Sequence, residues 1–460
     1  MVGTCSRILG VLHAPGRGSA ILLALLCSGA AWTQAPTPVT TPSTSSAVQL
    51  TLAQAIRNAL DQNPRLQQSL LVIAESGDDR RTAASALMPT VAAHAYGQRN
   101  KYNLEAQMGM TVPGFPMVVG PFNWNTVGLE TQISLFDLSL WKKWRASQHA
   151  EGSARAQGRA VREEITALVV GQYFRALRAI ASVKAGESRV ALAEALAKLA
   201  ENQQKQGVGT KLDTLRSQVQ LQTERQRLIQ AQTQRFTALA GLGRLLDLAP
   251  GTSIELQDSL SAPALPVGDF QAAFQAGLAQ RPELAALDAR EQAAENLRQA
   301  AQSLYLPTLV AAGSYGSTAL QSQPSATTYQ VSLGLRVPLF TGGLVSSQVA
   351  RAKSERNRVQ EAKRDVRAQV GYEIQVAQAE LEASAHEVEV SNLAVALSTE
   401  ALTQSQHRFE AGVSNNIELI NAQDELARAN DNQISALYRL NQSRADLARA
   451  TGQLESFFAR

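Results

Sequence analysis

The chain carries the same pattern twice, and this internal repeat limits its possible folds more than any other feature. The segment Ala-Ile-Arg-Asn-Ala-Leu-Asp-Gln-Asn-Pro, which ends at Pro64, resembles Ala-Phe-Gln-Ala-Gly-Leu-Ala-Gln-Arg-Pro, which ends at Pro282. In both halves a second proline follows twenty-five residues later. Further on, Gly207-Val-Gly is echoed by Gly412-Val-Ser. Each half therefore predicts the order helix, two strands, very long helix, turn and helix.

Long stretches without proline predict the long helices. There is no proline between Pro121 and Pro250, or after Pro338. Apolar residues in these stretches recur at steps of three, four and seven, which is the spacing of a narrow helical seam. We expect helices over about 140–206 and 344–411, each roughly 100 Å long at ~1.5 Å per residue. Such helices exceed a compact domain and suit a structure that crosses the periplasm.

Two segments, 127–135 and 329–339, alternate apolar and polar residues instead. Each is close to the 9–11 residues that a tilted strand needs in an outer membrane. One set of side chains is expected to face lipid and the other a water-filled lumen. The lipid set is Val127, Leu129, Ile133, Val331, Leu333 and Leu335, and the lumen set is Glu130, Gln132, Gln330 and Ser332.

Two more strands are expected from Val91 and Leu309, with exposed loops at 108–122 and 321–328. Four strands cannot close a barrel, and open sheet edges do not occur in lipid. The alternation therefore indicates an oligomer, unless the strands form a soluble amphipathic hairpin. Two chains would give eight strands with a filled interior, and three would give twelve with room for a lumen, which we favour.

The N-terminus is typical of a secretory signal peptide. Arg7 and Arg17 precede a short apolar run over 20–31, and small residues follow. We assign 1–35 to the signal peptide and the Pro/Ser/Thr-rich stretch 36–49 to a flexible linker.

Both cysteines, Cys5 and Cys27, lie in this leader, so the mature chain should have no disulfide and no cysteine metal site. Whether Cys27 is lipidated stays open. The formal charge falls from +4 to about +2 on removal of the leader, which is no signature of nucleic-acid binding.

The remaining boundaries follow from the repeat. The first repeat covers 50–250, an equatorial linker covers 251–269, and the second repeat covers 270–455.

Several ordered motifs resemble one known family. The closest stretch begins Arg408-Phe-Glu-Ala-Gly-Val-Ser-Asn-Asn-Ile-Glu and continues into an Ala/Leu ladder that ends at Gly452. Pro338-Leu-Phe-Thr-Gly-Gly and the early Ala-x-x-x-Asn-Pro element at Pro64 also fit. In their order and doubling, over about 50–455, these motifs resemble the TolC-type outer-membrane efflux channel family.

The resemblance implies a mainly α fold with β, in which long α-helical hairpins form a periplasmic tunnel. Four strands per chain would contribute to a trimeric, 12-stranded transmembrane barrel. The resemblance also implies a homotrimer in outer-membrane lipid that conducts substrates passively. An inner-membrane pump would deliver these substrates through a periplasmic adaptor, in a system for efflux or type I secretion. The expected adaptor-docking tips are the two turns, Gly207, Val208, Gly209, Gly412, Val413 and Ser414.

A periplasmic gate is expected just past these turns. Members of the family often carry two acids one helical turn apart there. In this chain the second half has Glu418 followed by Asn421, and the first half has Asp213 followed by Arg216. A double acidic ring is therefore in doubt, and an acid near a helix start also stabilises the helix dipole.

The sequence offers no catalytic constellation, so we expect neither an enzyme nor a cofactor or metal. The histidines lack metal-ligand spacing. Gly207-Val-Gly-Thr-Lys lacks the order of a phosphate-binding loop. The alternative is a periplasmic adaptor or structural coiled-coil protein, but an adaptor should carry one helical hairpin where this chain predicts two.

Overall fold

The computed structural model describes residues 48–104, 106, 109–110, 114, 116–262, 268–320, 324–411, 413–414 and 416–458. The predicted signal peptide and most of the predicted linker lie outside these residues. Cys5, Cys27 and Gly412 also lie outside them, as do parts of the two predicted loops and of the equatorial linker.

Each half opens with two helices that meet at a proline, where we predicted one. The residue before each proline, Asn63 or Arg281, is extended. The proline ring disfavours the helical region for the residue that precedes it, so the helix must stop and restart. The side chain of Asn63 then caps the new helix by accepting a hydrogen bond from the backbone N–H of Arg65, at 3.0 Å. These helices are α1 (Leu52–Gln62), α2 (Pro64–Ser85), α6 (Phe270–Gln280) and α7 (Pro282–Ser303).

The two long helical hairpins are confirmed, with boundaries within two residues of the prediction for both long helices. Asp137 caps the first long helix by accepting a hydrogen bond from the backbone N–H of Leu140, at 3.1 Å. A short helix, which the repeat did not predict, closes the chain after Gly452, a glycine with a φ of 72°. The helices are α4 (Leu138–Lys205), α5 (Lys211–Leu245), α8 (Leu344–Glu410), α9 (Asn416–Ala450) and α10 (Leu454–Phe458).

All four strands are present, but some of their ends differ from the prediction. The last strand stops at Arg336, although the alternation runs on to Leu339. Pro338 explains this, because it has no N–H to donate to a neighbouring strand. Residues 118–122 and 326–328, which we assigned to loops, belong to strands. The strands are β2 (Thr90–Asn103), β3 (Val118–Phe136), β5 (Thr308–Leu320) and β6 (Ala326–Arg336).

The four strands form one antiparallel sheet in the order β2-β3-β5-β6. Its register sorts the side chains as the alternation predicted, because directly paired residues project from the same face. One row runs Ala93, Leu129, Tyr315 and Tyr329, and one residue away along each strand a row on the opposite face runs Ala92, Glu130, Ser314 and Gln330. The predicted lipid set thus shares one face and the predicted lumen set shares the other; we call them the apolar face and the polar face.

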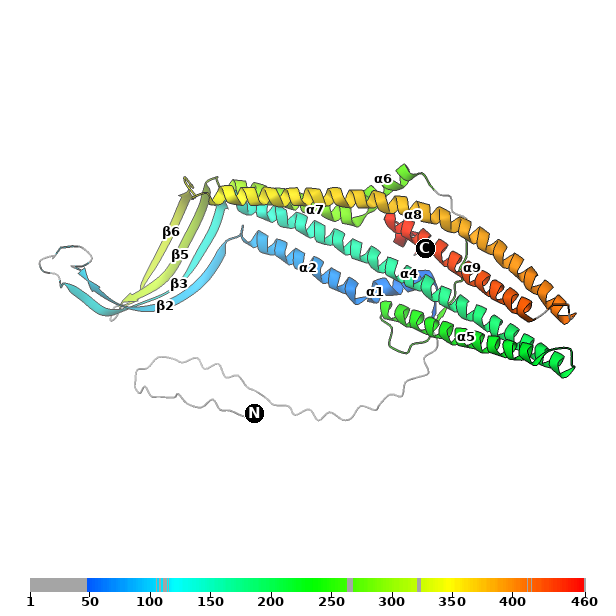
Figure 1. Ribbon diagram of the computed structural model, residues 1–460. Helices are drawn as coiled ribbons and strands as arrows, with labels where there is room; N and C mark the ends of the chain where they lie inside the picture. Colours follow the sequence, from blue (N-terminus) through cyan, green and yellow to red (C-terminus); the bar gives the residue numbers. More distant parts are fainter. Residues whose placement is uncertain are drawn as a thin grey trace, which may run out of the picture. The chain divides into compact units, whose positions relative to one another are not determined.

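The helices form a layer whose order follows from their contacts. Close to the sheet, α2 contacts α4, α4 contacts α7, and α7 contacts α8. Toward the hairpin turns, α5 contacts α4, α4 contacts α9, and α9 contacts α8. The strands extend from one end of this layer and the two hairpin turns lie at the other end (Figure 1).

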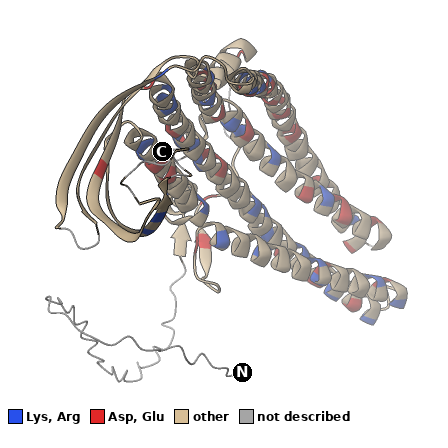
Figure 2. Ribbon diagram, turned by 90° about the vertical axis from the view of Figure 1, so that its left-hand side faces the viewer, with Lys and Arg blue, Asp and Glu red and all other residues tan. Residues whose placement is uncertain are grey.

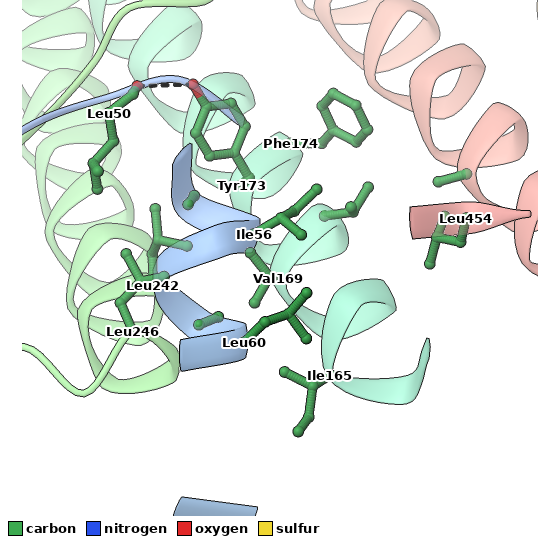
Figure 3. Packing of buried hydrophobic residues seen from close by; sticks show 14 of the residues in the cluster. Leu50, Ile56, Leu60, Ile165, Val169, Tyr173, Phe174, Leu242, Leu246 and Leu454 are labelled. Atoms are coloured by element: carbon green, nitrogen blue, oxygen red, sulfur yellow. Dashed lines mark hydrogen bonds between the residues drawn. The ribbon is translucent and has the colours of Figure 1, made fainter. Parts of the chain in front are cut away.

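The largest hydrophobic core lies midway along the layer, where α1 packs against α4 and α5 (Figure 3). The single hydroxyl proton of the fully buried Tyr173 of α4 is shared between two acceptors, the Asp258 carboxylate at 2.6 Å and the backbone carbonyl of Leu50 at 3.1 Å. Burial and the adjacent carboxylate raise the pKa of Tyr173. This contact anchors a two-stranded parallel sheet, β1 (Val48–Leu50) with β4 (Ile254–Leu256), which the sequence did not predict because both strands have three residues.

Charged residues are scattered along the helices and are scarce on the four-stranded sheet (Figure 2). Several ion pairs join neighbouring helices of the layer. Between α2 and α4, Glu151 contacts Arg80 at 2.6 Å and, within α4, Arg155 at 2.6 Å. Burial alone would raise the pKa of Glu151, but the hydrogen bonds and charges of the two arginines lower it.

Candidate functional site at the hairpin tips

The turn of the first hairpin is a tight reversal built by glycine. After α4 ends, Gly207 adopts a φ of 78°, a left-handed conformation that side chains disfavour. The backbone N–H groups of Val208 and Gly209 both donate to the carbonyl of Gln203 at 3.0 Å, which satisfies a carbonyl that the helix end leaves free. The Val208 side chain is left 76% exposed at the tip.

The turn of the second hairpin has a similar design. The backbone N–H groups of Val413 and Ser414 donate to the carbonyl of Arg408, at 3.0 and 3.3 Å. Val413 is 71% exposed, so each hairpin presents one valine at its end.

Asp213 lies in the first turn of α5 and takes part in its capping. The Thr210 hydroxyl accepts a hydrogen bond from the backbone N–H of Asp213 at 3.2 Å and donates one to the Asp213 carboxylate at 2.5 Å. A carboxylate in the first turn also interacts favourably with the helix dipole. The contacts of this side chain are therefore those of a helix-capping residue.

Asn416, in the first turn of α9, joins the second hairpin to the first. Its side-chain amide donates hydrogen bonds to the backbone carbonyl of Asp213 and to the Ser217 hydroxyl, both at 2.9 Å. The residue is 2% exposed, so water does not replace these bonds readily. Sequence reasoning did not single out Asn416; the signal available was an asparagine at a predicted helix start, a common capping residue.

Glu418 forms an ion pair inside its own hairpin. Its carboxylate lies 3.2 Å from the Arg408 guanidinium, and both side chains remain about half exposed. The other two residues predicted at the gate, Arg216 and Asn421, are exposed, and within the described part of the chain neither has an ion pair or side-chain hydrogen bond. The fold thus gathers the four residues in the first two turns of α5 and α9, without pairing their side chains with one another.

A hydrophobic cluster supports the tips from behind. Leu419 of α9 is fully buried against Leu196 of α4 and against Leu402 and Phe409 of α8. Apolar side chains from three helices thus meet just behind the Asn416 bonds, and they hold the start of α9 against α4 and α8.

A buried ionic cluster, which the sequence did not reveal, lies further along the hairpins. The Glu224 side chain of α5 is 5% exposed and lies 2.5 Å from Arg227 and 3.3 Å from Arg189 of α4. Arg189 also contacts Asp431 of α9 at 2.9 Å, and Gln220 donates to Asp424 of α9 at 3.1 Å. The cluster therefore ties α4, α5 and α9 together, because a buried carboxylate needs compensating partners.

Among the described residues there is no group of three or more His, Cys, Asp or Glu side chains placed to hold a metal ion. No described helix is both long and apolar enough to cross a membrane.

Comparison with known proteins identifies the family. The model of the outer membrane efflux protein family matches residues 55–247 and 273–453, which are the two halves of the internal repeat and most of the chain. The chain belongs to the outer membrane efflux protein family. It is an outer-membrane channel subunit whose helices extend into the periplasm.

Individual relatives agree with this assignment. Protein CyaE of Bordetella pertussis is 28% identical over 88% of this chain and 84% of that protein. The alkaline protease secretion protein AprF of Pseudomonas aeruginosa is 24% identical over 72% of this chain and 68% of that protein.

The crystal structure of the outer membrane protein VceC from Vibrio cholerae has the same fold, with a TM-score of 0.77 at 18% identity. The similarity covers 87% of this chain and 96% of VceC. The resemblance found in the sequence, the TolC-like two-repeat fold and the outer-membrane location are thus confirmed.

Proposed function

We propose that three copies of this chain form a passive export duct that receives its cargo from an inner-membrane pump through a periplasmic adaptor. The observation that carries the proposal is the end-to-end arrangement of the fold. An amphipathic sheet lies at one end of the long helices and two exposed valines, Val208 and Val413, lie at the other. In this proposal residues 1–35 are removed as a signal peptide on the way to the membrane.

The open sheet edges support closure by further copies. Strands β2 and β6 are the outer strands of the sheet, and among the described residues each has one side free of a partner strand. An unpaired edge is too costly in lipid, so the edge of β6 in one copy would pair with β2 of the next. Three copies give twelve strands, which leaves a lumen for cargo.

The edges of the helical layer support the same assembly. Helix α5 exposes Leu212, Leu215, Val219, Ile229 and Phe236, and helix α8 exposes Val390, Leu393 and Leu397. Most of these residues follow steps of three, four and seven, the spacing of a coiled-coil seam. Since α5 and α8 lie at opposite edges of the layer, the α8 of one copy would pack against the α5 of its neighbour.

The tips are proposed to dock the adaptor. The tip residues are Gly207, Val208, Gly209, Gly412, Val413 and Ser414. Two exposed valines at tight turns offer small apolar contacts on a rigid support, and a trimer would present six such tips. A partner that bears helical hairpins could pack its own turns between them.

The gate is proposed to lie just inside the tips. In a trimer, three copies of Glu418 would line the narrow end of the duct, with Asn421, Asp213 and Arg216 close by. Like charges in a confined pore repel one another, so closure requires other bonds, and the Asn416 bonds and the Arg408 ion pair are suitable.

The cargo class is proposed from similarity. AprF is named for the secretion of an alkaline protease, so an exported polypeptide is a candidate cargo for this chain as well. Small molecules expelled by an efflux pump are the alternative, and the same duct would serve both.

The docking proposal is tested by placing charges on the tips. The double variant Val208→Asp, Val413→Asp should abolish export by the cognate pump while trimer formation and membrane insertion stay intact. The matched control, Val208→Thr with Val413→Thr, keeps the shape of the side chains without a charge and should export normally. Normal export by the aspartate variant would reject docking at the tips. Measuring both polypeptide secretion and drug resistance in the same strains separates the two cargo classes.

A further inference from the structure

Glu130 is the one acidic side chain in the four-stranded sheet, whose strands carry no other Asp or Glu. It lies on the polar face of β3, directly paired with Ala92 of β2 and Ser314 of β5. Gln330 of β6 continues the same row. The carboxylate thus belongs to the face that the proposed duct turns toward its lumen.

The surroundings of Glu130 leave its charge unneutralised. It is exposed, and it has no ion pair with any residue that the structure describes. It borders a hollow of about 280 Å³ on the polar face of the sheet. Hydroxyl and amide groups line this hollow, contributed by Thr90, Gln132, Ser314, Gln330 and Ser332.

Positive groups on the same face are few. Arg336 lies in the row next to the helices, six residues along β6 from Gln330. At ~3.3 Å per residue this separation is about 20 Å, roughly two Debye lengths at physiological ionic strength. His94 lies one row away, paired with Gly128, and its ring stacks on Tyr96 at 5.7 Å. A guanidinium that distant does not cancel the charge of Glu130.

We propose that Glu130 sets the charge preference of the barrel section of the duct. In the proposed trimer, three carboxylates stand at one level of a lumen whose other side chains at that level are uncharged. A ring of carboxylates in a pore attracts cations, and the low-dielectric wall strengthens its field. The barrel therefore favours cationic groups of the cargo over anionic ones. This inference rests on the proposed function.

The test reads the local potential next to Glu130. Ser314→Cys places a thiol beside the carboxylate, in a mature chain that has no other cysteine once the leader is removed. Its rate of modification is measured with a cationic and an anionic methanethiosulfonate reagent, at pH 8 and low salt, in trimers inserted in vesicles. Taking the ratio of the two rates cancels the fraction of thiolate. A negative local potential of about 1 kT per unit charge attracts the cation and repels the anion. It should raise the ratio of the cationic to the anionic rate about 7-fold above the ratio for a free thiol.

The decisive comparison removes only the charge. Adding Glu130→Gln to Ser314→Cys should bring the ratio of the rates close to that of a free thiol, and Glu130→Asp should retain the preference. An unchanged ratio in the Glu130→Gln variant overturns the role of Glu130.

A second cysteine site separates this result from a failure of the duct itself. Val331→Cys, on the apolar face, should resist both reagents because it faces lipid. If Ser314→Cys does not react while Val331→Cys does, the polar face does not line the lumen. The proposed duct then fails, and the inference with it.

Discussion

The side-chain amide of Asn416 donates a hydrogen bond to the hydroxyl of Ser217 at 2.9 Å, across 199 residues of sequence. The same amide reaches the carbonyl of Asp213, so one buried side chain joins the start of α9 to the start of α5. Both helices begin at a hairpin tip. A change that separates the two tips must therefore break these bonds, and we propose that Asn416 acts as a lock that holds the tips together.

Removing this lock should open the periplasmic end. Asn416→Ala deletes both hydrogen bonds, each worth about 1 kcal/mol, and removes this donor from the buried Ser217 hydroxyl. We expect a larger single-channel conductance in planar bilayers and a higher sensitivity of the bacterium to a bulky antibiotic that the outer membrane normally excludes. Asn432→Ala, an exposed position further along α9 and outside the proposed gate, is the matched control and should behave as wild type. Equal conductance of the two variants would remove Asn416 from the account of closure.

Glu418 should give the closed end a modest sensitivity to divalent cations. Asn421 stands where a second acid would complete a double acidic ring. A trimer would therefore line the opening with three carboxylates and not with six. Divalent cations are therefore expected to reduce conductance weakly in wild type and not at all in Glu418→Gln. The measurement is a titration of planar-bilayer conductance with Mg²⁺. An identical titration curve for both proteins means that Glu418 does not line the pore.

The sequence predicted those parts of the fold that depend on local pattern. Proline also explains three boundaries that the prediction missed: Pro338 ends β6, and Pro64 and Pro282 each restart a helix. The assignment of side chains to the two faces of the sheet followed from the alternation alone. The strand register places Glu130 and Val331 on the faces that the alternation predicted.

Contacts between distant segments could not be predicted in this way. The Asn416 bonds and the Arg189 to Glu224 ion pair depend on how α4, α5 and α9 are placed, and no periodicity encodes that placement. The strands β1 and β4 are too short to display a pattern. The sequence identified the acids near the tips, but it did not predict that Asp213 would hydrogen-bond to Thr210 or that Glu418 would pair with Arg408.

The apolar seam between copies should be essential for assembly. Val390 and Leu393 of α8 are 70% and 61% exposed in a single chain, and we expect the α5 of the neighbouring copy to cover them. Val390→Asp with Leu393→Asp would bury two charges without partners, a cost of several kcal/mol. The variant should appear as monomers in native mass measurements in detergent, whereas Val208→Asp at the tip should remain trimeric. A stable trimer in the α8 variant would show that this face does not lie between copies.

The ion pairs of Glu151 should make the helical layer less stable in acid. The folded-state pKa of this carboxyl is lowered from its ordinary value of 4.5, because the two arginines outweigh the effect of burial. A lowered pKa means that Glu151 stabilises the folded state above about pH 4.5, and that this contribution is lost as the pH falls through the lowered value. Glu151→Gln should thus unfold at a lower temperature than wild type at pH 7, by an amount equivalent to about 1–2 kcal/mol. The difference in unfolding temperature between the two proteins should narrow toward pH 3, as followed by circular dichroism in detergent.

The matched control is Glu187→Gln, on an exposed turn of the same helix and without an ion pair to a described residue. It should match wild type at both pH values. A gap between wild type and Glu151→Gln that stays constant from pH 7 to pH 3 would mean that the charge of Glu151 contributes nothing to holding α2 against α4.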